Sequence, residues 1–256
     1  MITARRLKQA TYAGGCFSFL AFFLVVAIFL IAQPSFEPTP TPTPASIYEA
    51  FAVERVDSVE HSDGVDIVAQ IRNPNPRAGT GRYTVIFILY DKDGREILKH
   101  PETVYILPGS LQYVSALALR PSADVARIEV VIPAATDLIR LPEGQDLPTF
   151  SSFLRERATR VLGTSQIEEQ KGIIRNTSTI DWERVEVAGV ALDNTGKIVG
   201  IGKTFVGQLK SSEQREFVLQ WPAPLTSTQR VIVVPTTNIY AEENILKVIG
   251  DPSLLR

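Results

Sequence analysis

The residue types that most often do chemistry in enzymes are scarce in this sequence. The 256-residue chain has two histidines, His61 and His100, and one cysteine, Cys16. Each histidine stands in or next to a predicted turn, so we favour a solvated turn residue over a metal pair or a general base. The sequence has no Gly-x-Ser-x-Gly, His-Glu-x-x-His, phosphate-loop or Cys-x-x-Cys motif. We therefore predict that the protein is not an enzyme and has no catalytic, cofactor-binding or metal-binding residues.

Carboxylates are more numerous, and two groups of them raise the question of a calcium site. In Asp91-Lys92-Asp93-Gly94, followed by Glu102, glycine is fourth and Arg95 fifth. An EF-hand loop needs an oxygen ligand at the fifth position and glycine at the sixth, so this segment is interpreted as a hairpin turn. The second group would bind a cation only if it converged on one edge, and solvated strand and loop charges are the favoured interpretation. Its members are Glu54, Asp57, Glu60, Asp63, Glu168 and Glu169.

Composition excludes further classes of function. Hydrophobic residues make up 45% of the chain and the formal net charge is −2. These values are near the globular average and unlike those of a nucleic-acid binder, so no nucleic-acid partner is expected. Cys16 lies at the edge of an apolar segment. The rest of the chain therefore has no thiol for a disulfide, a thiolate metal site or a cysteine nucleophile.

The apolar segment predicts a membrane anchor. Residues 13–32 carry no charge, and a helix of about 20 such residues spans a bilayer. Arg5, Arg6 and Lys8 precede it, so the positive-inside rule places residues 1–12 in the cytoplasm and the C-terminal bulk outside the plasma membrane. A cleaved signal peptide is the competing interpretation, but its apolar region is usually shorter. A lipobox ending at Cys16 is disfavoured, because the apolar core follows the cysteine.

Prolines alternate with threonines after the anchor. Residues 33–46 are predicted to be a linker, and prolines at this spacing favour polyproline II, which rises about 3.1 Å per residue. The linker is interpreted as a spacer that lifts the C-terminal part from the lipid. Its rival role, as a ligand for a proline-binding module, lacks recognisable flanking residues.

Short runs rich in β-branched and aromatic residues follow, separated by Gly, Pro, Asn and Asp, which predicts strands and turns. In the first half the expected strands cover residues 51–59, 65–72, 83–90, 96–104, 112–119 and 127–132. In the second half they cover a segment near 159–167, then 171–175, 184–192, 198–205, 215–221 and 230–234.

The second half repeats the first. Ile71-Arg72-Asn73 recurs 103 positions later as Ile174-Arg175-Asn176. A second set recurs 102 positions later, which a loop one residue shorter explains. It pairs Asp91, Gly94, Val104, Leu107, Leu117, Val131 and Pro133 with Asp193, Gly196, Val206, Leu209, Leu219, Val233 and Pro235. We therefore predict a mainly β fold of two tandem β-sandwich domains, residues 47–146 and 159–256.

A short connecting helix is expected between them, at residues 147–158. Phe150, Phe153 and Leu154 share a helical face, and Thr149 is a suitable N-cap. Its expected role is to cover a sheet edge or the end of a core. Binding to a membrane surface through its arginines is the rival interpretation.

Two segments carry a family resemblance. Phe87-Ile88-Leu89-Tyr90-Asp91-Lys92-Asp93-Gly94 resembles the signature of the FxLYD domain family. Asn73-Pro74-Asn75-Pro76 is similar to the Asn-Pro turn of the related water-stress (WHy) and type 2 late-embryogenesis-abundant domains. The second half keeps the Leu, Asp and Gly but lacks the Phe and Tyr. The resemblance implies immunoglobulin-like antiparallel sandwiches of about seven strands, found in envelope or membrane-tethered proteins, and it implies no active site.

The two tryptophans differ in what they predict. Trp221 aligns with Leu119 and is expected in the core. Trp182 aligns with Thr80, and it is either a cap on the end of the sandwich, the favoured interpretation, or an exposed anchor for a partner. Residues 239–256 have no copy in the first half.

These observations favour a membrane-anchored extracytoplasmic protein that acts as a non-enzymatic interaction or structural module of the cell envelope. Its expected partners are the lipid bilayer, through the N-terminal helix, and an envelope protein or a second copy, through the surfaces 79–82 and 177–182. The alternative is an envelope receptor for a small molecule or a cation, or an enzyme with an unrecognised site.

Overall fold

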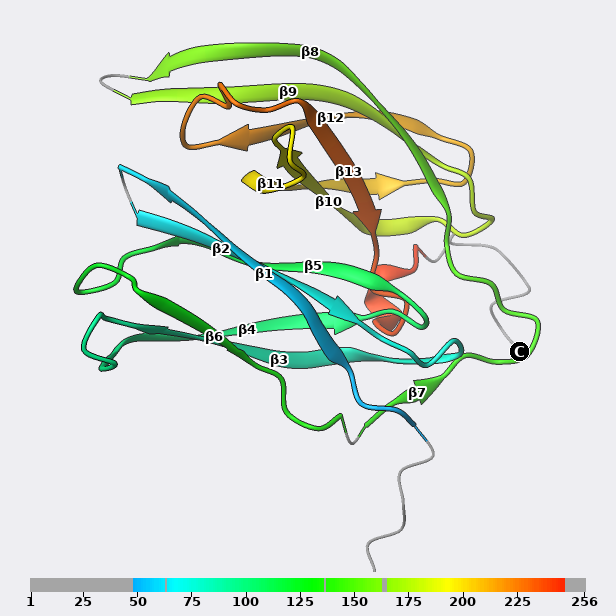
Figure 1. The fold of residues 1–256 in the computed structure, drawn as a ribbon. Helices are drawn as coiled ribbons and strands as arrows, with labels where there is room; N and C mark the ends of the chain where they lie inside the picture. Colours follow the sequence, from blue (N-terminus) through cyan, green and yellow to red (C-terminus); the bar gives the residue numbers. More distant parts are fainter. Residues whose placement is uncertain (1–47, 63, 136, 163–164, 247–256) are drawn as a thin grey trace, which may run out of the picture. The chain divides into compact units, whose positions relative to one another are not determined.

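A computed structural model describes residues 48–62, 64–135, 137–162 and 165–246 (Figure 1). The expected tail 1–12, membrane helix 13–32 and linker 33–46 lie outside these residues. Within the described ranges no helix is long and apolar enough to cross a membrane. The fold is mainly β, and every pair of neighbouring strands is antiparallel, as the sequence predicts.

The first half builds two sheets that face each other. One has the strand order β1-β2-β5, and the other has the order β4-β3-β6, with β7 pairing with the start of β3. The strands are β1 (Ala52–His61), β2 (Gly64–Arg72), β3 (Ala78–Tyr90), β4 (Glu96–Ile106), β5 (Leu111–Leu119), β6 (Arg127–Val131) and β7 (Ile139–Arg140).

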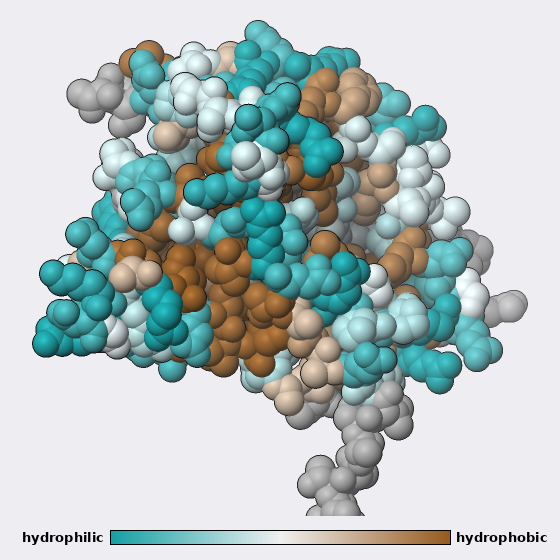
Figure 2. Space-filling model, viewed as in Figure 1, coloured by the Kyte–Doolittle hydropathy of each residue, from teal (hydrophilic) through white to brown (hydrophobic). Residues whose placement is uncertain are grey.

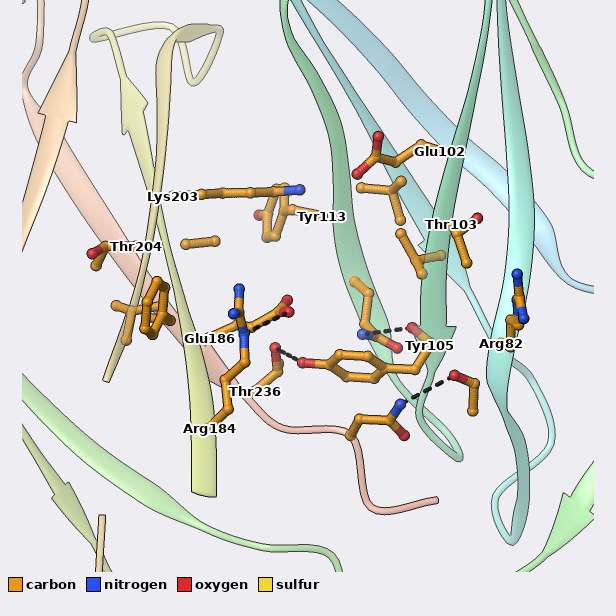
Figure 3. Close-up of a pocket in the computed structure, with 18 residues that line it drawn as sticks. Arg82, Glu102, Thr103, Tyr105, Tyr113, Arg184, Glu186, Lys203, Thr204 and Thr236 are labelled. Carbon is orange, nitrogen blue, oxygen red and sulfur yellow. Dashed lines mark hydrogen bonds and ion pairs between the residues drawn. The ribbon is translucent and has the colours of Figure 1, made fainter. Parts of the chain in front are cut away.

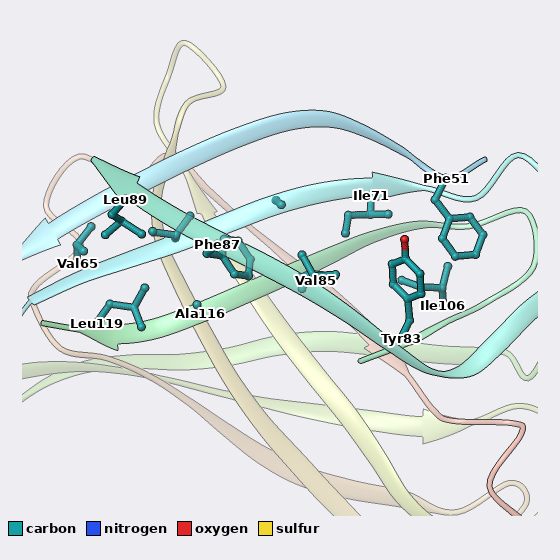
Figure 4. Close-up of a cluster of buried hydrophobic side chains, with 13 residues drawn as sticks. Phe51, Val65, Ile71, Tyr83, Val85, Phe87, Leu89, Ile106, Ala116 and Leu119 are labelled. Carbon is teal, nitrogen blue, oxygen red and sulfur yellow. The ribbon is translucent and has the colours of Figure 1, made fainter. Parts of the chain in front are cut away.

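Alternation of side chains explains the core between these two sheets (Figure 4). In β2 the odd-numbered residues Ile67, Ala69 and Ile71 are fully buried, as their spacing predicts. They meet Val85 and Phe87 of β3, which are also fully buried. One apolar face of each sheet is thus removed from water.

The second half repeats this arrangement, with sheets in the order β12-β9-β8 and β11-β10-β13. Its core contains Trp182 and Trp221, which are 1% and 2% exposed, so Trp182 is part of the packing and is not an exposed anchor. The elements are β8 (Phe150–Leu162), β9 (Ser165–Asn176), β10 (Trp182–Leu192), β11 (Ile198–Leu209), β12 (Gln214–Trp221), β13 (Arg230–Thr236) and the 3-10 turn η1 (Glu242–Asn244).

A buried asparagine ends the second strand of each half. The side-chain amide of Asn73 donates to the carbonyls of Ala78 and Leu107, at 2.7 and 2.9 Å, and its oxygen accepts from the backbone N–H of Asn75 at 2.9 Å. Asn176 donates to the two corresponding carbonyls, at 2.7 and 3.2 Å. Both asparagines are 0% exposed. Each one satisfies backbone groups where the chain leaves the sheet.

The two Asp-x-x-Gly turns also have the same geometry. The Oδ1 atoms of Asp91 and Asp193 each accept from the backbone N–H groups two and four residues later, at 2.8 to 2.9 Å. Gly94 and Gly196 take φ values of 77° and 82°, which favour glycine. The hydroxyl of Thr195, together with these backbone donors, lowers the pKa of Asp193. Both segments are hairpin turns.

The prediction of a connecting helix at residues 147–158 is wrong. Most of that segment belongs to β8, which pairs with β9 along its whole length, and the strand expected near 159–167 straddles the β8–β9 turn. Phe150 and Leu154 pack on the second core, whereas Phe153 is 51% exposed. A spacing of four places two residues on one face of a helix or of a strand, so Phe150 and Leu154 alone did not distinguish the two.

Replacing either buried asparagine should destabilise the protein strongly. Asn73→Ala or Asn176→Ala leaves two carbonyls without their donor in a buried place, at a cost of about 2–4 kcal/mol in the free energy of unfolding. Urea unfolding of the full chain in detergent, followed by tryptophan fluorescence, measures this loss. Asn194→Ala, in an exposed turn, is the matched control and should leave the midpoint unchanged. Equal midpoints for all three variants would contradict the role given to the asparagines.

Candidate functional site

A cleft of about 520 Å³ lies between the two sandwiches (Figure 3). A volume of this size is in the range of small-molecule sites, about 300–1,000 Å³. Edge strands β4 and β5 form one wall, and the outward face of β10 and β11 forms the other. The charged and aromatic residues of its lining are Arg82, Glu102, Tyr105, Tyr113, Arg184, Glu186, Lys203 and Phe205.

The second wall is part of the outward face of β10 and β11, which is apolar at one end and carries charged side chains at the other. Residues of β10 and β11 that lie opposite each other and point away from the second core form four pairs: Leu192 with Ile198, Val190 with Ile201, Ala188 with Lys203, and Glu186 with Phe205. The first two pairs are buried against Val68 of β2. The last two pairs extend beyond this contact and line the cleft.

The side chain of Lys203 extends from one wall of the cleft toward the other. The residue as a whole is exposed, but its ammonium group reaches from β11 toward Tyr113 and Glu102 of the other wall (Figure 3). Nζ donates to the carbonyl of Ser115 at 3.3 Å. Burial of the ammonium lowers the pKa of Lys203, and the carboxylates of Glu102 and Glu186 oppose that effect. The ammonium is therefore partly desolvated and stands between two acidic groups.

Polar and aromatic groups of both sandwiches meet below Lys203. The hydroxyl of Tyr105 and that of Thr236 form a hydrogen bond of 2.8 Å. Burial raises the pKa of Tyr105, and Glu186 raises it further, so the phenol stays neutral and serves as a hydrogen-bonding group. Arg184 Nε lies 3.8 Å from Glu186 Oε1, and its guanidinium lies 4.2 Å from the ring centroid of Phe205.

A smaller recess of about 290 Å³ shares part of this lining. Tyr105, Arg184, Glu186 and Asn238 belong to both spaces. The recess adds two more carboxylates, those of Glu183 and Glu243. Its lining is therefore more acidic than that of the main cleft.

The segment 237–246, which has no copy in the first half from residue 239 onward, ties the two sandwiches together. Asn238 Nδ2 donates to the carbonyl of Gly81 at 3.1 Å. Tyr240 packs so closely on the same glycine that a Cβ there would lie 2.7 Å from Tyr240 Cβ. Downstream, Ile245 forms an isolated antiparallel bridge with Trp182. Residues 247–256 lie outside the described part.

Neither histidine lines the cleft. The prediction that His61 is solvated is wrong. Its side chain is 2% exposed, and Nε2 lies 3.2 Å from Oδ1 of Asp66, which also accepts from the backbone N–H of Ala118 at 2.7 Å. His100 is half-exposed, but it lies within β4, paired with Phe87, and not at a turn as expected. Its Nε2 lies 3.3 Å from Oε2 of Glu102. Among the residues that the structure describes, none that lines the cleft is a histidine or a cysteine.

Four members of the acidic group singled out in the sequence lie in separate ion pairs, and Glu60 is exposed, as expected. Glu54 pairs with Arg72, Asp57 with Arg55, Glu168 with Arg157, and Glu169 with Arg160. Glu168 and Glu169 are 5% and 6% exposed, so the solvated interpretation is wrong for these two. Asp63 lies outside the described residues. In the part of the chain that the structure covers, no three His, Cys, Asp or Glu side chains are placed to hold a metal ion.

Of the two surfaces expected to bind a partner, 79–82 is half-buried, whereas 177–182 is exposed or partly exposed at every residue except Trp182. In 79–82, Gly79 and Thr80 are buried, whereas Gly81 and Arg82 line the cleft. In 177–182, the buried Trp182 donates from Nε1 to the hydroxyl of Ser178 at 3.1 Å.

Sequence reasoning missed Lys203 and Glu186. The sequence did contain a signal for them. In 184–192 and 198–205, the positions that face away from the second core are Leu and Ile at one end of the strands and Glu and Lys at the other.

The contact between Tyr240 and Gly81 should matter for stability. Gly81→Ala forces a methyl group into the Tyr240 side chain, and we expect a loss of about 1–3 kcal/mol in the free energy of unfolding. Thermal unfolding of the full chain measures it. Gly207→Ala is the matched control, because the nearest atom would lie at an ordinary 3.7 Å. In the double variant Gly81→Ala/Tyr240→Gly, which also removes the Cβ of residue 240, the two losses should not add. Additive losses would contradict the contact.

Comparisons with known proteins leave the family open. No family model matches the chain. No curated protein matches it either. A solved structure of red sea bream transglutaminase is similar over 73% of this chain and 30% of that one, with 12% sequence identity and a TM-score of 0.21. The chain thus spans less than a third of that protein's length, and a likeness this weak carries no argument about fold or activity. The resemblance to the FxLYD family stays a prediction.

Proposed function

We propose that this chain is a membrane-anchored, extracytoplasmic binding protein without catalytic activity, and that it holds its ligand in the cleft between its two sandwiches. The observation that carries the proposal is the cleft itself. It combines a volume suited to a small ligand with acidic, basic and aromatic groups that converge from both sandwiches.

The side chains of the cleft support binding over catalysis. Nucleophilic catalysis needs an activated nucleophile beside a base, and acid-base catalysis needs a group that titrates near the working pH. Tyr105 is held as a neutral phenol, and its hydroxyl is engaged with Thr236. Burial lowers the pKa of Lys203, the carboxylates of Glu102 and Glu186 oppose that effect, and its Nζ donates to the carbonyl of Ser115. These groups are suited to hold charge and hydrogen bonds in place.

The membrane location rests on the sequence. The uncharged segment 13–32, the basic residues before it and the proline-rich linker after it support a single-pass anchor in the plasma membrane with the sandwiches outside.

We also propose that each sandwich is an immunoglobulin-like domain of the FxLYD type. Phe87 and Leu89 of the signature are fully buried in the first core. The Tyr90 ring lies 3.7 Å below the guanidinium of Arg127, and Asp91 closes the hairpin turn. The signature residues thus have roles in packing and turn formation, which suits a fold signature without an active site.

Interaction with an envelope protein is the second candidate function, and one observation favours it. Figure 2 shows apolar surface gathered over β1 and β6, the edge strands on one side of the first sandwich. Val53 and Val56 of β1 and Ile128 and Val130 of β6 are only partly buried there. Edge strands with apolar neighbours are suited to pair with another chain.

Photo-crosslinking in intact cells distinguishes the two candidates. A benzoylphenylalanine at Phe205, inside the cleft, should give an adduct whose added mass is that of a small molecule. The same probe at Val161, 67% exposed and outside the cleft, is the matched control and should give none. Intact-protein mass spectrometry reads the result. A protein-sized adduct at Val130 together with no adduct at Phe205 would favour the second candidate and overturn the first.

Topology is tested separately. Protease added to intact spheroplasts should remove the segment from residue 33 onward, because the charge bias places only the short N-terminal tail inside. An antibody against the C-terminus reads the loss on a blot, and lysed spheroplasts control for protease activity. Full protection in intact spheroplasts with loss after lysis would reverse the orientation.

A further inference from the structure

We propose that the cleft recognises a ligand that carries both a carboxylate and a primary ammonium group, such as an amino acid or a short peptide with free termini. This inference rests on the proposed binding function and adds the chemical class of the ligand. The inference has two bases. Charged groups of both signs line the cleft, and Lys203 and Glu186 are incompletely paired within the protein.

Charges of both signs line the same space. Glu102 and Glu186 act on Lys203 from the two walls, and Arg82 and Arg184 bring two more cations. A ligand with negative charge alone would meet the two carboxylates, and one with positive charge alone would meet the three cations. A ligand with one group of each sign places each group against its opposite.

Several of these groups keep hydrogen-bonding capacity for a ligand. Among the described residues, the ammonium of Lys203 has one hydrogen bond, to the carbonyl of Ser115, although it carries three donors. Glu186 has Arg184 at 3.8 Å, which is long for a charge-assisted hydrogen bond. Charged groups that are partly desolvated and incompletely paired are costly, and a ligand of the opposite charge relieves that cost.

The positions of these groups also give the ligand a direction. Lys203 stands at the Tyr113 and Glu102 end of the cleft (Figure 3). The opposite end holds Tyr105, Arg184 and Glu186, which also line the recess with Glu183 and Glu243. We place the ligand carboxylate at Lys203 and its ammonium at Glu186 and the acidic recess. The aromatic faces of Tyr113 and Phe205 lie on either wall for an apolar side chain.

Titration calorimetry on the full chain in nanodiscs tests the ligand class. The probe is the tripeptide Ala-Phe-Ala with free termini, compared with its N-acetylated form and its C-terminal amide. The free peptide should bind, and each blocked form should bind at least roughly tenfold more weakly, because one charge then lacks its partner. Glycerophosphoethanolamine, whose anion is a phosphate, is the arm for a lipid headgroup and should bind more weakly than the free peptide.

Two variants assign the ends of the ligand. Lys203→Met should remove the difference between the free acid and the amide, and Glu186→Gln should remove the difference between the free amine and the acetylated form. Lys92→Met, in the exposed hairpin turn of the first sandwich, is the control and should change neither difference. A merely structural role for Lys203 or Glu186 would weaken all three peptides equally.

The outcomes separate this inference from the proposed function. Blocked peptides that bind as well as the free one would overturn the ligand class, as would tighter binding of glycerophosphoethanolamine. No binding of the free peptide, with a small-molecule adduct still formed at Phe205 in cells, would also overturn the class and leave the binding function standing. No binding and no adduct would overturn both.

Discussion

Burial of one half of a sheet face holds the two sandwiches together, and the candidate site depends on it. Leu192, Val190, Ile198 and Ile201 leave water against Val68, which provides most of the driving force for this contact. The same strands continue beyond the contact into Ala188 and Glu186, so the face that binds one sandwich to the other also provides a wall of the cleft. Weakening the apolar half would therefore change the width of the cleft as well as the stability of the pair.

The framework of each sandwich was predictable because its determinants are local and repeated. Asn73 and Asn176, Asp91 and Asp193, and the glycines after them recur at a constant spacing, and the structure gives each member of a pair the same hydrogen bonds. Turn residues of this kind act within a few positions of themselves in sequence or at strand ends, so their types alone carry the information. The strands between them follow from alternating burial.

What the sequence did not reveal depends on contacts between distant segments. His61 was expected in water, but it is buried beside Asp66, whose Oδ1 atom also holds the backbone of Ala118 in a left-handed conformation with φ of 53°. The strand β8 was mistaken for a helix because a spacing of four residues suits both. The cleft was not predictable, since Glu102 and Lys203 are about a hundred positions apart and belong to different sandwiches.

The two copies share a framework and differ where they meet. The positions in the first half that correspond to Glu186 and Lys203 are Thr84 and Pro101, so the charges of the cleft are not part of the repeated pattern. The turn at Gly196 accepts a hydrogen bond of 3.0 Å at its carbonyl from Arg55 Nη1 of the first sandwich. The packing is thus unsymmetrical, the β1-β2-β5 face of one copy against the β11-β10-β13 face of the other. Because neither sandwich alone has both walls, the cleft exists only where the two sandwiches dock.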